Sequence, residues 1–99
     1  MNTGPAAVIR SFKDKRAETV FTGRCPKGFP ADLLKVARRR LEAVHAAVRL
    51  EDLRSPPGNR LEALTGDRVG QHSIRINDQF RICFRWHDGA ENVEIVDYH

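Results

Sequence analysis

Several residue types and motifs that mark common protein classes are scarce or missing in this sequence. The chain has two cysteines, Cys25 and Cys83, which form no CxxC pair, and four histidines without zinc-binding spacing. No segment approaches the roughly 20 apolar residues that span a bilayer, and residues 1–7 lack the basic start and apolar centre of a signal peptide. Phosphate-binding glycine loops and the G-x-S-x-G motif are also missing. We therefore expect a protein of the reducing cytoplasm, with no membrane segment and no metal or other cofactor.

The length of 99 residues suits one domain with a single, modest core. Residues 1–7 are small and polar without a repeating pattern, and we expect them to form a disordered arm. Residues 8–99 are then expected to form a single domain.

The chain is basic, with 17 Lys and Arg against 13 Asp and Glu and a formal net charge of +4. Every cation from Arg38 onward is an arginine. Arginine is the better bidentate ligand for phosphate, so this bias favours a polyanionic partner. A genome that prefers arginine codons explains the bias equally well, and an acidic protein partner also suits the charge.

The hydrophobic pattern predicts an α+β fold, in which a strand and two helices precede a strand-rich half. A strand is expected over residues 8–12, and a short helix over residues 14–22 with Asp14 as its N-cap. A longer helix begins near Pro30. Its apolar stripe is made of Leu33, Ala37, Leu41, Val44 and Val48. Further strands are expected over residues 60–64, 71–77, 80–87 and 91–98, with Asn77-Asp78 and Asp88-Gly89 as tight turns.

Alternation along the strands gives the predicted sheet two different faces. The helices must cover the apolar face, which carries Ile74, Ile76, Phe80, Ile82, Phe84 and Trp86. The opposite face carries Arg75, Arg81 and Arg85, together with Cys83, which we expect to be a packed thiol. An antiparallel sheet can leave one face open to solvent. We therefore predict a concave, arginine-lined surface of the kind that holds a nucleic-acid backbone.

Three groups able to exchange protons, Asp97, Tyr98 and His99, lie together beside an arginine-bearing strand. RNA is cleaved without a metal when its 2′-hydroxyl attacks the adjacent phosphorus, while one group removes a proton and another protonates the leaving oxygen. Histidine suits either role because its ordinary pKa is about 6.5, and Arg81 or Arg85 can hold the charged phosphate. Tyr98 can stack on a base or donate a proton. A frayed terminal histidine and a half-buried strand tyrosine are the simpler alternatives.

Four segments carry a resemblance to a known family. They are IRSF at residues 9–12, PGNRLEALTGDR at 57–68, GQHSIRINDQFRICF at 70–84 and VEIVDYH at 93–99. Together they resemble the HigB-type toxins of the RelE/ParE superfamily, which belong to type II toxin–antitoxin systems. The resemblance spans residues 8–99. It implies a RelE-like fold, with an N-terminal strand and two helices packed on a mainly antiparallel sheet of about four to five strands.

The same resemblance implies an activity and partners. HigB-type toxins are similar to RelE, which enters the A site of the 30S ribosomal subunit and cleaves messenger RNA there without a metal. The family's terminal Asp, Tyr and His correspond to Asp97, Tyr98 and His99, and its strand arginine corresponds to Arg81. Further RNA contacts are expected from Arg60, Arg68, Arg75 and Arg85. The implied cognate partner is a HigA-type helix-turn-helix antitoxin, operator DNA is bound only through that complex, and the implied location is the bacterial cytoplasm.

The sequence departs from the family pattern at Thr65, where well-studied relatives have a lysine, and at Glu62, where they can have a histidine. A lysine can stabilise the phosphate charge of the transition state, and losing one such contact commonly costs about a hundredfold in rate. We therefore expect a weak or moderate endoribonuclease and a mild toxin, with Arg68 or Arg60 as possible substitutes for the lysine.

Two other functions stay open at this point. ParE toxins resemble the same fold yet poison DNA gyrase without cutting RNA, and a fold alone does not choose between the two activities. The cluster of Asp97, Tyr98, His99 and Arg81 favours the nuclease, because a gyrase poison needs no proton-handling groups. The third candidate is a catalytically weak toxin that acts mainly in antitoxin and operator regulation, and the change at Thr65 is its support.

Overall fold

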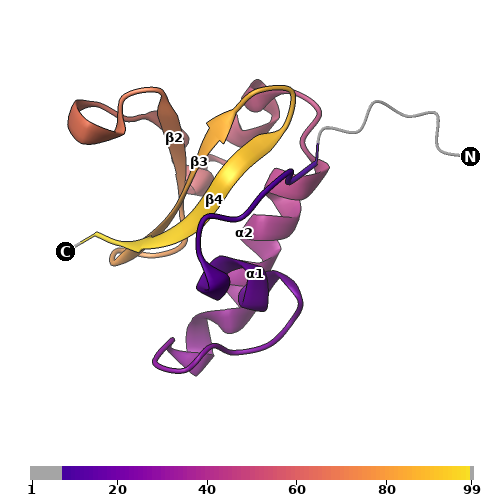
Figure 1. Ribbon diagram of the computed structural model, residues 1–99, viewed down its shortest axis with the longest axis vertical. Coiled ribbons are helices and arrows are strands. Elements are labelled where there is room, and N and C mark those ends of the chain that lie inside the picture. The colour runs from indigo at the N-terminus through magenta and orange to yellow at the C-terminus, as the bar shows by residue number, and fades with distance from the viewer. Residues whose placement is uncertain (1–7, 99) are drawn as a thin grey trace, which may run out of the picture.

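Two helices cover one face of a four-stranded antiparallel sheet in the computed structural model, which describes residues 8–98 (Figure 1). The helices are α1 (Lys15–Phe21) and α2 (Leu34–Ala46). The strands are β1 (Glu62–Ala63), β2 (Gln71–Arg75), β3 (Phe80–Trp86) and β4 (Ala90–Asp97), paired in sequence order. The predicted α+β fold is confirmed. None of the helices within residues 8–98 is long and apolar enough to cross a membrane.

The helices form where their capping and apolar spacing predict, and α2 ends earlier than the stripe suggests. Asp14 caps α1 by accepting a hydrogen bond from the Ala17 backbone N at 2.8 Å. Leu41 of α2 is fully buried, but Val48 is 51% exposed, so its place in the apolar stripe was wrong. The reason is local: the Asp52 carboxylate accepts hydrogen bonds from the backbone N of Val48 at 2.9 Å and of Arg49 at 3.0 Å, which starts a 3-10 helix, Leu50–Arg54.

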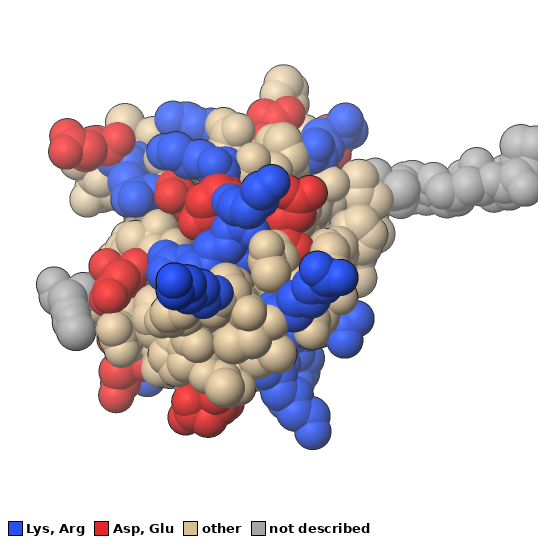
Figure 2. Space-filling view, turned by 60° about the horizontal axis from the view of Figure 1, so that its bottom comes forward, with Lys and Arg blue, Asp and Glu red and all other residues tan. Residues whose placement is uncertain are grey.

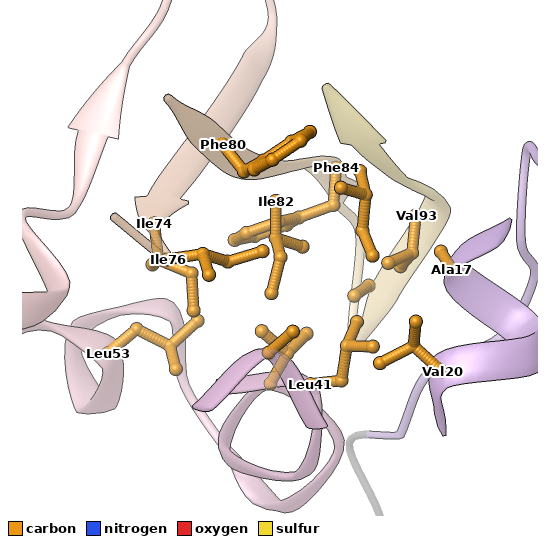
Figure 3. Close-up of a cluster of buried hydrophobic side chains, with 14 of the residues drawn as sticks. Ala17, Val20, Leu41, Leu53, Ile74, Ile76, Phe80, Ile82, Phe84 and Val93 are labelled. Carbon is orange, nitrogen blue, oxygen red and sulfur yellow. The ribbon is translucent and has the colours of Figure 1, made fainter. Parts of the chain in front are cut away.

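The core lies between the helices and the apolar face of the sheet, as the alternation predicts. Figure 3 shows Leu41 of α2 and Val20 of α1 directed towards the sheet, with Leu53 closing one end. The strand side chains Ile74, Phe80, Ile82, Phe84, Val93 and Ile95 are all buried, as is Ile76, which follows the end of β2 at Arg75. Complete burial of one such side chain stabilises a fold by about 1.5–3 kcal/mol. Trp86 packs against this cluster at its margin.

Two tight turns set the register of the strands that carry the arginines. The Asn77 side-chain oxygen accepts hydrogen bonds from the backbone N of Gln79 at 2.9 Å and of Phe80 at 2.7 Å, which closes the β2–β3 turn. The β3–β4 turn places Asp88 and Gly89 at φ 56° and 128°, as the predicted Asp-Gly hairpin requires. The β2–β3 turn makes Arg75 the direct cross-strand partner of Arg81.

The predicted strand over residues 8–12 is not formed as a strand. The segment runs beside β4 (Figure 1) through two isolated parallel bridges, Ile9 to Ala90 and Phe12 to Val93. Between the bridges Asn92 has φ 54° and donates its backbone N–H to Ser11 Oγ at 2.8 Å, which interrupts the ladder. The expected disordered arm, residues 1–7, lies outside the described residues.

The predicted strand over residues 60–64 is also shorter than expected. Arg60 has φ 49° and ends a 3-10 helix, Pro57–Asn59, so the strand is only Glu62–Ala63. This left-handed residue turns the chain into β1, which pairs with β2 at Ser73 and His72.

Candidate active site

A polar hollow of about 250 Å³ lies on the face of the sheet away from the helices, near the end of β4. It is lined by Arg60, Glu62, Arg75, Asn77, Asp78, Arg81 and Tyr98. The structure thus brings together four of the residues expected to act on RNA: Arg60, Arg75, Arg81 and Tyr98. Three guanidinium groups in one hollow provide the positive charge that a phosphate requires.

Arg81, on β3, is held from several sides. Its Nη1 donates to Glu62 Oε1 at 3.0 Å and its Nη2 donates to the Arg60 backbone oxygen at 3.1 Å. The side chain is 11% exposed, and its buried Nε forms no hydrogen bond within the described chain. A guanidinium that is held in this way is oriented to stabilise an anion bound in the hollow.

Tyr98 follows β4 and packs beside Arg81. The Arg81 guanidinium carbon lies 5.7 Å from the centre of the Tyr98 ring, a cation–π contact. The Tyr98 backbone N donates to the Gln79 oxygen at 2.6 Å, which fixes the chain at this point. Tyr98 as a whole is 39% exposed, which leaves the residue accessible for stacking on a base.

Tyr98 lies close to the Cys83 thiol of β3. Burial raises the pKa of Tyr98, and the neighbouring Cys83 raises it further. Burial likewise raises the pKa of Cys83, which is completely inaccessible, so the predicted packed thiol is confirmed. Tyr98 is therefore a neutral phenol at physiological pH, suited to stacking and to hydrogen-bond donation and unsuited to removing a proton.

Asp97 ends β4 and lies next to this hollow without lining it. Its Oδ2 accepts a hydrogen bond from Gln79 Nε2 at 3.1 Å. His99, the third member of the predicted cluster, lies outside the described residues.

Arg68 and Arg85, two further predicted RNA ligands, lie outside this hollow. Arg68 Nη1 donates to Glu94 Oε2 at 2.9 Å and to Gln71 Oε1 at 3.0 Å, and the hydrogen bond to Glu94 raises the pKa of Arg68. Arg85 lines a separate hollow of about 280 Å³ with Lys13, Gln71, Asn92 and Glu94. Gly70 makes room for it, since a Cβ there would lie 2.7 Å from Arg85 Nη1.

The predicted arginine-lined face carries carboxylates as well as arginines. Glu62 pairs with Arg81 and Glu94 with Arg68, while Asp78 pairs with Arg75. Figure 2 shows basic and acidic side chains interleaved on the face turned to the viewer. Sequence alternation identified the cations, but it missed these partners because they come from other strands and from a turn.

Glu62, Asn77 and Asp78 line the hollow, although none of them was expected from the sequence to have a role in binding or catalysis, and Glu62 is the one that contacts Arg81. Glu62 was noted only as a departure from a family histidine. Its signal was weak, because a glutamate on a short, exposed strand normally has no special role. Its place beside Arg81 follows from the pairing of β1 with β2, which aligns Glu62 with Ser73.

Thr65 is exposed and begins a 3-10 helix, Gly66–Arg68. It does not line the hollow, whereas Arg60 does. Of the two candidates to replace the missing lysine, Arg60 is therefore the one that the structure places near Arg81.

A larger hollow of about 470 Å³ lies on the helical side, against α2. It is lined by Gly23, Ala31, Leu34, Lys35, Arg38, Arg39 and Glu42, which include no histidine, cysteine or tyrosine. The smaller hollow beside Arg81 is the better candidate because it joins cations, carboxylates and Tyr98. Within residues 8–98, no group of three or more His, Cys, Asp or Glu side chains is placed to hold a metal ion.

The fold and the sequence comparisons agree on the class of protein. Two helices against a four-stranded antiparallel sheet are consistent with RelE-like toxins. The sequence profile of the HigB-like toxins, described as RelE-like toxin of type II toxin-antitoxin system HigB, matches residues 10–99. The chain belongs to this family, so the resemblance seen in its sequence is confirmed, and membership implies a cognate antitoxin.

Three relatives show how far the similarity extends. Toxin HigB-1 of Vibrio cholerae serotype O1 is 39% identical over 89 residues, which cover 89% of this chain and 94% of the relative. Endoribonuclease HigB of Proteus vulgaris is 32% identical over 93 residues, covering 93% of this chain and 100% of the relative. An uncharacterised protein of Haemophilus influenzae is 37% identical over 70 residues, covering 71% of this chain and 69% of the relative.

Proposed function

We propose that this toxin is an endoribonuclease that cleaves messenger RNA in the ribosomal A site, without a metal, and so inhibits translation. One observation carries the proposal: Arg81 is fixed by two hydrogen bonds in a hollow that also contains Arg60, Arg75 and Tyr98. The name of the Proteus vulgaris relative, an endoribonuclease, supports the same activity.

The geometry suits transfer of a phosphoryl group within RNA. The scissile phosphate binds against Arg81, whose guanidinium stabilises the charge that develops as the 2′-oxygen attacks phosphorus. Arg60 and Arg75 line the same hollow and hold the flanking backbone. The exposed part of the Tyr98 ring stacks on a base and holds the nucleotide in place. Asp97 and His99, which adjoin Tyr98 in the sequence, are the proposed groups for proton transfer to the leaving oxygen.

We further propose the partners that this activity requires. The substrate is messenger RNA held by the 30S subunit, in the bacterial cytoplasm. The cognate antitoxin is of the HigA type, with a helix-turn-helix, and the toxin reaches operator DNA only within that complex. The basic character of the chain, with a net charge of +4, suits all of these polyanionic surroundings.

The activity is expected to be weak or moderate. Thr65 carries no charge and lies outside the hollow, so it cannot replace the lysine that relatives carry at this place. Arg60 supplies charge from the other end of β1, at the left-handed turn that begins the strand.

A primer-extension map of one reporter messenger in a purified translation system tests the proposal. It compares the intact toxin with Arg81→Gln and with His99→Gln, each with and without ribosomes. Cleavage that requires ribosomes and fades in both variants is the expected result. Intact messenger in every lane would overturn the nuclease, and an assay of DNA gyrase supercoiling would then test the ParE-like alternative.

A further inference from the structure

We propose that the hollow beside Arg85 is a second phosphate subsite, which binds the backbone of the same RNA strand whose phosphate lies against Arg81. This inference rests on the proposed recognition of RNA. The Arg85 hollow measures about 280 Å³. Arg81 and Arg85 point to the same face of β3, because side chains alternate along a strand, and their separation corresponds to about 13 Å. A short stretch of RNA backbone spans such a distance.

Side chains from four parts of the chain meet in the Arg85 hollow. Lys13 follows the N-terminal segment and is placed by its backbone N, which donates to the Val93 oxygen at 2.8 Å. Gln71 begins β2 and is the cross-strand partner of Arg85. Asn92, at φ 54°, lies where the register of β3 and β4 shifts, and such bulges are common beside functional sites because they re-aim side chains. The pairing of the strands therefore determines the lining of the hollow.

The Arg85 side chain has no carboxylate partner, unlike those of Arg75 and Arg81. Within residues 8–98 it forms no ion pair and no hydrogen bond, although its cross-strand partner on β4 is Glu91. Its guanidinium lies over Gly70, where a Cβ would be 2.7 Å from Nη1. The missing side chain of Gly70 thus makes room for an exposed guanidinium whose donors are available to an external anion.

Glu94, the carboxylate that lines the Arg85 hollow, is neutralised within the protein. Its Oε2 accepts a hydrogen bond from Arg68 Nη1 at 2.9 Å and lies 3.6 Å from Lys13 Nζ, and its side chain is only 13% exposed. Arg68 also donates to Gln71 Oε1, which leaves the amide NH₂ of Gln71 as a donor. Three cations thus face one carboxylate, and the balance of charge favours a phosphate.

The surface between the two hollows suits RNA better than an acidic protein segment. Cys83 lies between Arg81 and Arg85 on β3, and Tyr98 and Arg68 both lie close to its buried thiol. A strand that crosses from one hollow to the other therefore passes an exposed aromatic residue, on which a base can stack, and a further cation. An acidic peptide offers the same negative charge but no bases for this stacking.

The binding of non-cleavable RNA tests the subsite. Fluorescently labelled 2′-O-methyl oligoribonucleotides of stepwise increasing length are titrated with the full-length toxin, and fluorescence anisotropy gives the affinity over a range of salt concentrations. Arg85→Gln removes the charge, and Arg85→Lys retains it. Arg24→Gln is the matched control, because Arg24 is an exposed arginine in the loop after α1 and lines neither hollow. Circular dichroism checks the folding of each variant.

We expect the affinity of the intact toxin to rise at the length that reaches both hollows, and we expect Arg85→Gln to abolish this rise. Arg85→Gln should weaken binding of the longest RNA by about tenfold at low salt and leave the shortest unaffected. The slope of log affinity against log salt concentration should become shallower by about 0.7, the contribution of one phosphate contact in single-stranded RNA. Arg85→Lys should retain most of the affinity, and Arg24→Gln should stay within about twofold of the intact toxin.

Single-turnover cleavage on programmed ribosomes gives a second readout. Arg85→Gln should raise the half-saturating toxin concentration by about tenfold and leave the maximal rate within about threefold, because Arg85 does not contact the scissile phosphate. A loss confined to the maximal rate overturns the subsite, since it would place Arg85 in the chemical step.

The outcomes separate this inference from the proposed function. The subsite is overturned if Arg85→Gln weakens RNA of every length equally, if Arg24→Gln weakens it as much, or if the intact toxin binds no RNA at low salt. It is also overturned if a polyglutamate peptide binds the intact toxin as tightly as RNA and depends on Arg85, because the hollow then takes carboxylates. Cleavage that persists in any of these cases leaves the nuclease in place. Length-dependent binding through Arg85 without any cleavage supports the subsite and overturns the nuclease.

Discussion

Arg75 and Arg81 lie directly opposite each other on β2 and β3, as cross-strand partners on the face away from the helices. Like charges in such a pair destabilise a sheet. Each is offset by a carboxylate from elsewhere in the chain, Asp78 for Arg75 and Glu62 for Arg81. The fold thus tolerates a concentration of positive charge that the sheet alone would resist, at the place where we propose that a phosphate binds.

Replacing Arg81 is expected to distinguish the contribution of the candidate active site to cleavage from that of the other arginines on the same face. Arg81→Gln should slow single-turnover cleavage by about 100-fold or more, because the phosphate loses its fixed guanidinium. Arg85→Gln is the matched control: it lies on the same strand but lines a different hollow. It should alter cleavage by no more than about tenfold. Equal losses of cleavage rate in the two variants would contradict the placement of the active site in the hollow beside Arg81.

Restoring a lysine at position 65 is expected to strengthen the toxin. Thr65 is exposed and its side chain makes no capping hydrogen bond, so Thr65→Lys leaves the fold intact. An added charge near the phosphate should raise the cleavage rate by about tenfold. Ala63→Lys adds the same charge on a neighbouring exposed residue of β1 and controls for a general increase in basicity. If both variants are equally stimulated, the effect is non-specific attraction to RNA rather than catalysis.

The buried Cys83 thiol is expected to make stability depend on pH. Burial raises its pKa in the folded state, so the unfolded chain releases this proton first as pH rises. Its contribution is complete below the unfolded pKa of about 8.5 and is lost as pH rises through the folded value. Urea unfolding from about pH 7 to about pH 9.5 should show a falling free energy of unfolding.

Two cysteine variants isolate this effect. Cys83→Ala should flatten the decline of the free energy of unfolding with pH, whatever its effect at pH 7. Cys25→Ala should leave the decline unchanged, because Cys25 is exposed. A decline of equal slope in the intact toxin and in Cys83→Ala would show that other groups cause it.

Substitutions at Leu41, within α2, and at Val48, just beyond it, are expected to lower the free energy of unfolding by very different amounts. Leu41 is fully buried against the sheet, and Leu41→Ala should lower the free energy of unfolding by about 2–5 kcal/mol. Val48 is 51% exposed, and Val48→Ala should change it by less than about 0.5 kcal/mol. Urea denaturation followed by circular dichroism measures both. A large loss in Val48→Ala would mean that the apolar stripe of α2 extends further than the structure shows.

The sequence predicted best those features that depend on local alternation. Ile82 and Phe84 are buried beneath the helices, and Arg81 and Arg85 point to the other face, because side chains alternate along any strand. The turn at Asp88-Gly89 was equally clear, because it needs residues that tolerate positive φ.

Features that depend on contacts between distant segments were less predictable. The ion pairs of Arg81, Arg75 and Arg68 depend on Glu62, Asp78 and Glu94, which come from different elements. Val48 lies outside the apolar stripe because its backbone N–H donates to the Asp52 carboxylate instead of continuing the helix. The spacing of apolar residues along a helix does not predict such a contact. Glu62 enters the candidate site through the pairing of a two-residue strand, which has almost no signature in sequence.

The pairing of Arg68, Arg75 and Arg81 with carboxylates has a consequence for how RNA binding responds to salt. An unpaired arginine that meets a phosphate releases mobile counterions from the RNA, and each such contact makes affinity fall more steeply with salt concentration. An arginine that is already paired with a glutamate or aspartate must give up that ion pair to bind the phosphate. Part of the favourable free energy of the arginine–phosphate contact is therefore offset by the loss of the pair within the protein. The toxin therefore behaves in RNA binding as a less cationic protein than its arginine content suggests, which favours discrimination by the shape of the hollow over indiscriminate attraction to nucleic acid.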